Sequence, residues 1–208
     1  MSDYKRVFSI LERSHQLTML EQLSRYTHFQ RLIATVLSAR TKDITVIPIV
    51  KELFKIYPGA KELTHIPIKE LEHRLYRIGF YRVKARNIKK LSAMILKEFQ
   101  GKVPSTLEEM ITLPGVGRKT ANCMLNYSFN KPAIAVDVHV HRISNRLGWT
   151  KTKTPEETEQ ELMRILPKEL WNKVNMLLVD YGQRVCLPLR PRCGECKVRK
   201  YCEYGKEQ

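Results

Sequence analysis

The sequence lacks long apolar runs, internal repeats, low-complexity tracts and flexible linkers. No apolar segment approaches the roughly 18 to 20 residues that a membrane-spanning helix needs. Residues 1–6 lack the apolar stretch of a secretory signal, so we expect an intracellular protein. Nothing suggests an oligomer, and we expect a monomer.

Acidic residues are scarce in this chain of 208 residues. The sequence has 37 Lys and Arg against 21 Asp and Glu, which gives a net charge of +16 and a pI near 9.8. Hydrophobic residues at 43% and charged residues at 28% are typical of a globular chain, which argues against wholesale disorder. The basic excess indicates a polyanionic partner, and nucleic acid is favoured over an anionic membrane.

The basic charge is concentrated between Glu72 and Lys102, where nine Lys and Arg residues face only two Glu residues. One interpretation is a solvated helix face. The other is a surface that faces phosphate groups.

Strand-like patterns are nearly absent. Only residues 133–140 alternate, and one strand cannot build a sheet, so we expect an extended connection that leads into a helix over 138–147. Thr106 and Thr154, each followed by acidic residues, predict two helix starts. Elsewhere apolar residues recur at helical spacing, as in Leu32, Ile33, Val36 and Leu37, and in Leu91, Met94, Ile95 and Phe99. The fold class predicted from these patterns is all-α, built from many short helices.

The segment 113–121, Leu-Pro-Gly-Val-Gly-Arg-Lys-Thr-Ala, is the most informative part of the sequence. Its glycines permit positive φ and close approach of a ligand to the backbone. The helix that follows would present free N–H groups to an anion, which binds phosphate without reading base sequence. A plain turn between helices is the alternative, and the spacing excludes a Walker loop. With the basic charge, the segment predicts a helix-hairpin-helix at about 108–124.

Lys119 and Asp137 are the candidates for chemistry. Lys119, in the first turn of the second helix, is either a phosphate contact or a nucleophile activated by its positive surroundings and partial burial. Asp137 lies in an apolar run, where it can cap a helix and also stabilise a developing cation. His139 and His141 have no further ligand nearby, so a structural or phosphate-contacting role is favoured.

The five cysteines are unevenly distributed. Cys123 stands alone, while the tail reads Cys186-x6-Cys193-x2-Cys196-x5-Cys202. We expect no disulfides in an intracellular chain, and the four clustered thiols predict a metal site. Their spacing is compatible with a [4Fe–4S] cluster or with a structural zinc ion.

Taken together, these motifs resemble the endonuclease III family of helix-hairpin-helix DNA glycosylases. The resemblance runs from His28 to Cys202 and is most specific at 113–122, at 135–142 and in the cysteine spacing. It implies two all-α domains that flank a DNA-binding cleft. These would be a six-helix barrel at 24–130, and an iron–sulfur domain formed by 1–23 with 131–208, whose cluster loop is 186–202.

The resemblance also implies a function, namely removal of oxidised pyrimidines from duplex DNA in base excision repair, followed by AP lyase cleavage of the strand. Lys119 would attack C1′ and form a Schiff base, and Asp137 would stabilise the cationic sugar. The four tail cysteines would hold a [4Fe–4S] cluster. The implied partner is duplex DNA with damaged or abasic sites. The lack of a secretory signal and of a membrane-spanning segment leads us to expect the protein in the cytoplasm or at the nucleoid. The implied DNA contacts are Gly115, Val116, Gly117, Arg118, Thr120, Arg40, Thr41, Phe80 and His139.

Two positions depart from the common bacterial pattern of this family. Arg40 and Phe80 replace the Gln and Leu that fill the gap left by a flipped nucleotide. Phe80 remains an apolar wedge, and Arg40 retains donors for the orphaned base. The alternatives are a monofunctional mismatch or uracil glycosylase, against which Lys119 argues, and a non-catalytic helix-hairpin-helix DNA-binding protein.

Overall fold

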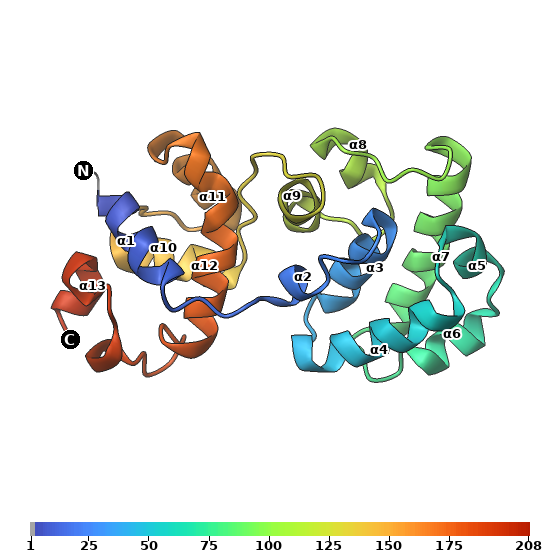
Figure 1. Cartoon of the computed structure of the whole chain (residues 1–208), viewed down its shortest axis with the longest axis horizontal. Helices are drawn as coiled ribbons and strands as arrows, with labels where there is room; N and C mark the ends of the chain where they lie inside the picture. Colours follow the sequence, from blue (N-terminus) through green and yellow to red (C-terminus); the bar gives the residue numbers. More distant parts are fainter. Residues whose placement is uncertain (1–2) are drawn as a thin grey trace. The chain divides into compact units, whose positions relative to one another are not determined.

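The computed structural model describes residues 3–208, and within them the regular structure is entirely helical (Figure 1). Residues 130–137 have no regular structure and lead into helix α10, Val138–Leu147. The predicted all-α class and this extended connection are therefore confirmed. The predicted iron–sulfur domain begins at residue 1, and its first two residues, Met1 and Ser2, lie outside the described residues. None of the helices described is long and apolar enough to cross a membrane.

The chain forms two compact units, and the first is Met19–Phe129. Its helices are α2 Met19–Gln22, α3 His28–Ser38, α4 Asp43–Ile56, α5 Ala60–His65, α6 Ile68–Arg74, α7 Tyr81–Glu98, α8 Leu107–Thr112 and α9 Arg118–Tyr127. Helix α7 packs against α5 and α6, while α3 packs against α4 and α9.

The apolar stripes predicted from the sequence form the core of this first unit. Leu32, Ile33 and Leu37 of α3 are fully buried, as are Leu91 and Ile95 of α7. Helix α3 begins with a capping box, in which Thr27 and Gln30 each accept a hydrogen bond from the other's backbone N–H. A cap at one end and an apolar face along its length hold α3 in the centre of the unit.

The second unit joins residues 3–18 to Asn130–Gln208. Its helices are α1 Asp3–Glu12, α10 Val138–Leu147, α11 Pro155–Ile165, α12 Trp171–Arg184 and α13 Glu203–Lys206, with 3₁₀ turns at Lys168–Leu170, Cys193–Glu195 and Arg199–Tyr201. Helix α1 packs against α12, which is far away in the sequence.

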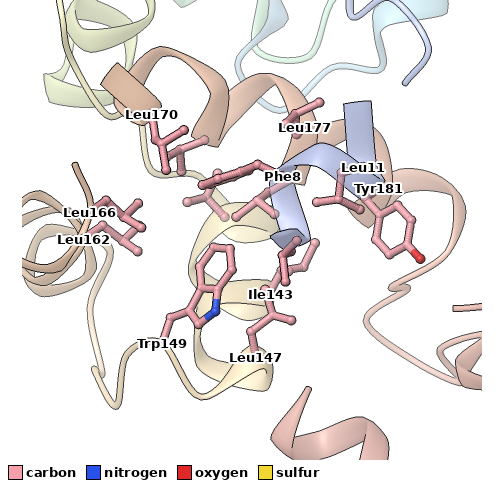
Figure 2. Close-up of a cluster of buried hydrophobic side chains, with 14 of the residues drawn as sticks. Phe8, Leu11, Ile143, Leu147, Trp149, Leu162, Leu166, Leu170, Leu177 and Tyr181 are labelled. Carbon is pink, nitrogen blue, oxygen red and sulfur yellow. The ribbon is translucent and has the colours of Figure 1, made fainter. Parts of the chain in front are cut away.

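The core of the second unit includes Phe8, Leu11, Trp149 and Tyr181 (Figure 2). The rings of Tyr4 and Phe8 meet Trp149 edge-on, with centroids 5.2 and 5.4 Å away. A buried carboxylate, Asp180, accepts a hydrogen bond from the Gln16 backbone N–H at 3.1 Å. The N-terminal helix therefore completes a core that the C-terminal residues build.

The two predicted helix starts are confirmed. Thr106 caps α8, accepting from the Glu109 N–H, and Thr154 forms a capping box with Glu157 at the start of α11.

The domain ranges implied by the resemblance place the first boundary after residue 23, whereas the compact units divide after residue 18. The six-helix barrel stays a prediction.

Candidate functional site

The glycine hairpin connects α8 to α9, and its two glycines meet different needs. Gly115 has φ +82°, and a Cβ there would lie 2.9 Å from Asn87 Nδ2. Gly117 has an ordinary φ of −94° and caps α9, and nothing lies within 4 Å of the Cβ it lacks. Gly115 is therefore required by the fold, while Gly117 leaves its backbone open to a ligand.

The side chains of the hairpin are partly turned inward. Val116 and Thr120 are buried, so Val116 offers a ligand only its backbone. Arg118 and Lys119 are exposed in the first turn of α9. The partial burial considered for Lys119 is not observed. What the structure provides is a lysine at a helix N-terminus next to an open backbone, where anions are favoured.

In the same unit, the loop that follows α3 and the loop that precedes α7 lie side by side, although they are far apart in the sequence. They carry Arg40 and Phe80. Arg40 has φ 55° and Phe80 has φ 58°, both left-handed, and the Arg40 guanidinium lies 5.6 Å from the Phe80 ring centroid. The Phe80 side chain is 62% exposed. The Thr41 hydroxyl accepts a hydrogen bond from the Gly79 N–H at 3.0 Å, which joins the two loop ends.

Lys84 is a residue whose place the sequence reasoning missed. Its ammonium is buried and donates to the backbone oxygens of Leu37 and Ala39, at 2.8 and 2.5 Å, and to Thr41 Oγ1 at 3.3 Å. Burial lowers the pKa of Lys84 to about 8. The spacing of Lys84 in the sequence could have indicated its burial, because Lys84 lies seven residues before Leu91, on the same buried face of α7.

Other members of the basic run also have structural partners. Lys89 donates to the backbone oxygens of Thr64 and Ile66, at 2.6 and 2.5 Å. Arg74 pairs with Glu70 at 2.8 Å. The run is therefore not one uniform phosphate-facing surface, since several of its cations are used to hold the first unit together.

Asp137 lies in the second unit as the N-cap of α10. Its Oδ1 accepts from the N–H groups of His139 and Val140, both at 2.9 Å. The His139 ring lies next to Arg142, with Nδ1 and Nη2 3.1 Å apart, and it fills the space that a side chain at Gly182 would occupy. The capping role is thus confirmed, and one carboxylate oxygen is fixed in place by the backbone.

All four tail cysteines line one hollow, and none of the five cysteines, all of which lie within the described residues, forms a disulfide. Three donors point at the sulfurs. Arg146 Nη1 donates to Cys186 Sγ at 3.3 Å, the Tyr181 hydroxyl to Cys196 Sγ at 3.4 Å, and the Gly205 N–H to Cys202 Sγ at 3.3 Å. Such donors suit sulfurs that carry negative charge, as metal-bound thiolates do.

The arrangement of these thiols bears on which metal they fit. A zinc ion at about 2.3 Å from each sulfur draws its ligands close together. Across residues 3–208, no three His, Cys, Asp or Glu side chains gather closely enough to hold a single ion. A [4Fe–4S] cluster spaces its four thiolates around a larger body. Four thiols that line one hollow, with three hydrogen-bond donors directed at their sulfurs, have the ligand chemistry that a [4Fe–4S] cluster requires.

Comparison with known proteins supplies further findings. Residues 33–168 match the model of the HhH-GPD superfamily base excision DNA repair proteins. The chain is 48% identical to endonuclease III of Thermotoga maritima over 86% of this chain and 84% of the relative. It is 41% identical to endonuclease III of Bacillus subtilis, over 86% and 83% of the two chains.

Solved structures give a consistent result. A trapped covalent intermediate of endonuclease III with DNA matches 100% of this chain and 99% of its own, with a TM-score of 0.85 and 37% identity. A thermostable thymine-DNA glycosylase matches 88% and 86% of the two chains with a TM-score of 0.78, but at 24% identity it supports the fold alone.

Proposed function

We propose a substrate and a reaction for this chain, which belongs to the HhH-GPD superfamily of base excision DNA repair proteins and is a DNA glycosylase. The proposed function is removal of oxidised pyrimidines from duplex DNA, followed by cleavage of the strand as an AP lyase. The observation that carries this proposal is the exposed Lys119 in the first turn of α9, directly after the glycine hairpin. A monofunctional glycosylase does not need an amine at this position.

Lys119 is the proposed nucleophile. Its neutral amine attacks C1′ of the damaged nucleotide, the bond from C1′ to the base breaks, and the base leaves with a proton. Opening of the sugar gives a Schiff base between Lys119 and C1′. Loss of a proton from C2′ then expels the 3′ phosphate, which is β-elimination.

Asp137 is the proposed electrostatic partner of the cationic sugar. One of its oxygens accepts two backbone N–H groups, which fixes the orientation of the carboxylate. A preoriented negative charge stabilises a developing cation without reorganising, and a carboxylate can also move the protons that the reaction requires.

DNA binding is proposed for two surfaces of the first unit. The open backbone at Gly117 and the side chain of Arg118 would bind phosphate, with Gly115, Val116 and Thr120 shaping the hairpin. Arg40 and Phe80, positioned by Thr41, would enter the duplex where the damaged nucleotide leaves the stack. In the second unit, His139 next to Asp137 is a further proposed contact.

The cofactor proposed for the four tail cysteines is a [4Fe–4S] cluster. Cys186, Cys193, Cys196 and Cys202 would hold it, and the sulfur-directed donors described above suit bound thiolates. Bonds from the cluster to these four cysteines would hold the segment 186–202 in one conformation. That segment carries Arg190, Arg192, Lys197 and Arg199, which add to the basic surface.

Borohydride trapping on a duplex with one abasic site tests the nucleophile. We expect a covalent band for the wild type and no band for Lys119→Gln, whereas DNA binding of the variant remains within a few-fold because one charge among many is lost. Lys61→Gln, which removes an exposed charge of α5, is the matched control and should still be trapped.

Other results would redirect the proposal. Base release without nicking by the wild type would indicate a monofunctional glycosylase. Binding without base release or trapping would leave only a DNA-binding role. A covalent band of normal strength with Lys119→Gln would place the nucleophile at another residue.

A further inference from the structure

Lys84 connects the two loop ends that carry Arg40 and Phe80. It lies in the first turn of α7, four residues after Phe80, and its backbone N–H donates to the Phe80 carbonyl at 3.0 Å. Its side chain reaches away from α7, and the ammonium donates to three oxygens within residues 37–41. One residue thus links the loop before α7 to the end of α3.

The end of α3 suits a buried ammonium. The last carbonyls of a helix have no partner within the helix and carry the negative end of its dipole. The carbonyls of Leu37 and Ala39 receive two of the three ammonium donors. The third reaches the Thr41 hydroxyl, which also accepts from Gly79. The ammonium therefore binds the loop ends to each other.

Both residues that flank this link adopt an unfavourable backbone conformation. Arg40 and Phe80 have positive φ, which non-glycine residues adopt only when their surroundings hold them there. The loop ends also touch directly, because a Cβ at Gly79 would lie 2.9 Å from the Arg40 carbonyl oxygen. The hydrogen bonds of Lys84 help to hold Arg40 and Phe80 in this backbone conformation.

We propose that Lys84 is a positioning residue for lesion recognition, which holds Arg40 and Phe80 as one preformed pair. This inference rests on the proposed function, in which these two side chains enter the duplex. A pair that is already ordered loses less conformational freedom on binding. Lys84 itself is buried and acts only through Arg40 and Phe80.

Lys84→Met tests the inference, with Lys89→Met as its matched control. Both lysines lie on α7 and donate to backbone carbonyls, but the partners of Lys89 are Thr64 and Ile66, outside the segments 37–41 and 78–80. Each substitution removes one charge and keeps most of the side-chain volume. A general loss of stability or of charge should affect both variants alike.

The measurement is affinity for two duplexes, one undamaged and one with a tetrahydrofuran abasic analogue. For Lys84→Met we expect the preference for the lesion duplex to fall about tenfold, through weaker lesion binding. Affinity for undamaged DNA should change no more than in Lys89→Met, whose preference should match the wild type.

A double-mutant cycle shows whether Lys84 acts through the pair. In an Arg40→Ala, Phe80→Ala background, Lys84→Met should lower the lesion preference less than about twofold further, because the pair it positions is absent. A full additional loss would overturn the inference. If Lys84→Met does not fold, Thr41→Val serves instead, since it removes the shared hydroxyl at similar volume and should lower the preference in the same direction.

Failure of this inference is distinguishable from failure of the proposed DNA contacts. If Arg40→Ala with Phe80→Ala keeps the full lesion preference, the proposed contacts are wrong. If that pair lowers the preference while Lys84→Met and Thr41→Val behave like Lys89→Met, the positioning role alone is overturned.

Discussion

Asp137 combines a structural role with a proposed chemical one, and two substitutions separate them. Its carboxylate caps α10 through two backbone N–H groups. Asn can still accept these hydrogen bonds, whereas Ala cannot. Asp137→Asn should therefore keep wild-type stability but lose most base release, and Asp137→Ala should lose about 1 kcal/mol of unfolding free energy as well.

Urea unfolding and single-turnover base release measure these two effects. Equal and large losses of stability in both variants would contradict the capping argument. Wild-type base release by Asp137→Asn would remove Asp137 from the chemistry.

The buried ammonium of Lys84 should make stability depend on pH. Burial lowers its folded-state pKa from 10.5 to about 8. Between these values the unfolded chain binds the proton more tightly than the folded one, so the contribution of Lys84 to stability rises as the pH rises. The unfolding free energy of the wild type relative to Lys84→Met should thus increase from pH 8 to pH 10. A constant difference, measured by urea unfolding across this range, would contradict the lowered pKa.

At the scale of elements, the two glycines of the hairpin between α8 and α9 have different roles. Gly115 is required by the fold, and Gly117 leaves the backbone accessible to a ligand. Gly115→Ala places a methyl group against Asn87 at positive φ and should cost about 1 to 3 kcal/mol of stability. Gly117→Ala meets no neighbouring atom and should leave stability nearly unchanged. It should instead weaken DNA binding, because the methyl group covers the open backbone.

Unfolding experiments and fluorescence anisotropy with labelled duplex DNA check this pair. Normal DNA affinity for Gly117→Ala would argue against phosphate binding at the hairpin backbone. Normal stability of Gly115→Ala would show that Asn87 moves aside and that the strain is small.

The helices also show which local signals were informative. Thr106 and Thr154 predicted helix starts correctly, because a capping hydrogen bond involves residues only three apart. The run of nine basic residues was less informative, because charge alone does not distinguish an exposed cation from one that donates to backbone carbonyls. Lys84 and Lys89 serve carbonyls that lie distant in the sequence.

At the scale of the whole molecule, the metal content of the purified protein tests the cluster. We expect iron and acid-labile sulfide in equal amounts, and Cys202→Ser should lose both. The segment 186–202 should then lose its order, which lowers both the unfolding temperature and DNA affinity, because metal binding and folding are coupled. Cys123→Ala, which changes the buried thiol of the other unit, should keep the iron. Zinc without sulfide would contradict the proposal.

Local spacing was enough to predict the all-α class, the helix-hairpin-helix, the cap at Asp137 and the grouping of the four tail thiols, because each depends on residues that lie close together in the chain. The three-dimensional fold alone places α1 in the core that contains Trp149, and it brings Lys84 to the place where it ties the loop of Arg40 to that of Phe80. It also decided that Gly115 and Gly117 serve different purposes. These facts depend on contacts between residues far apart in the chain, and no local pattern encodes which distant segments will meet.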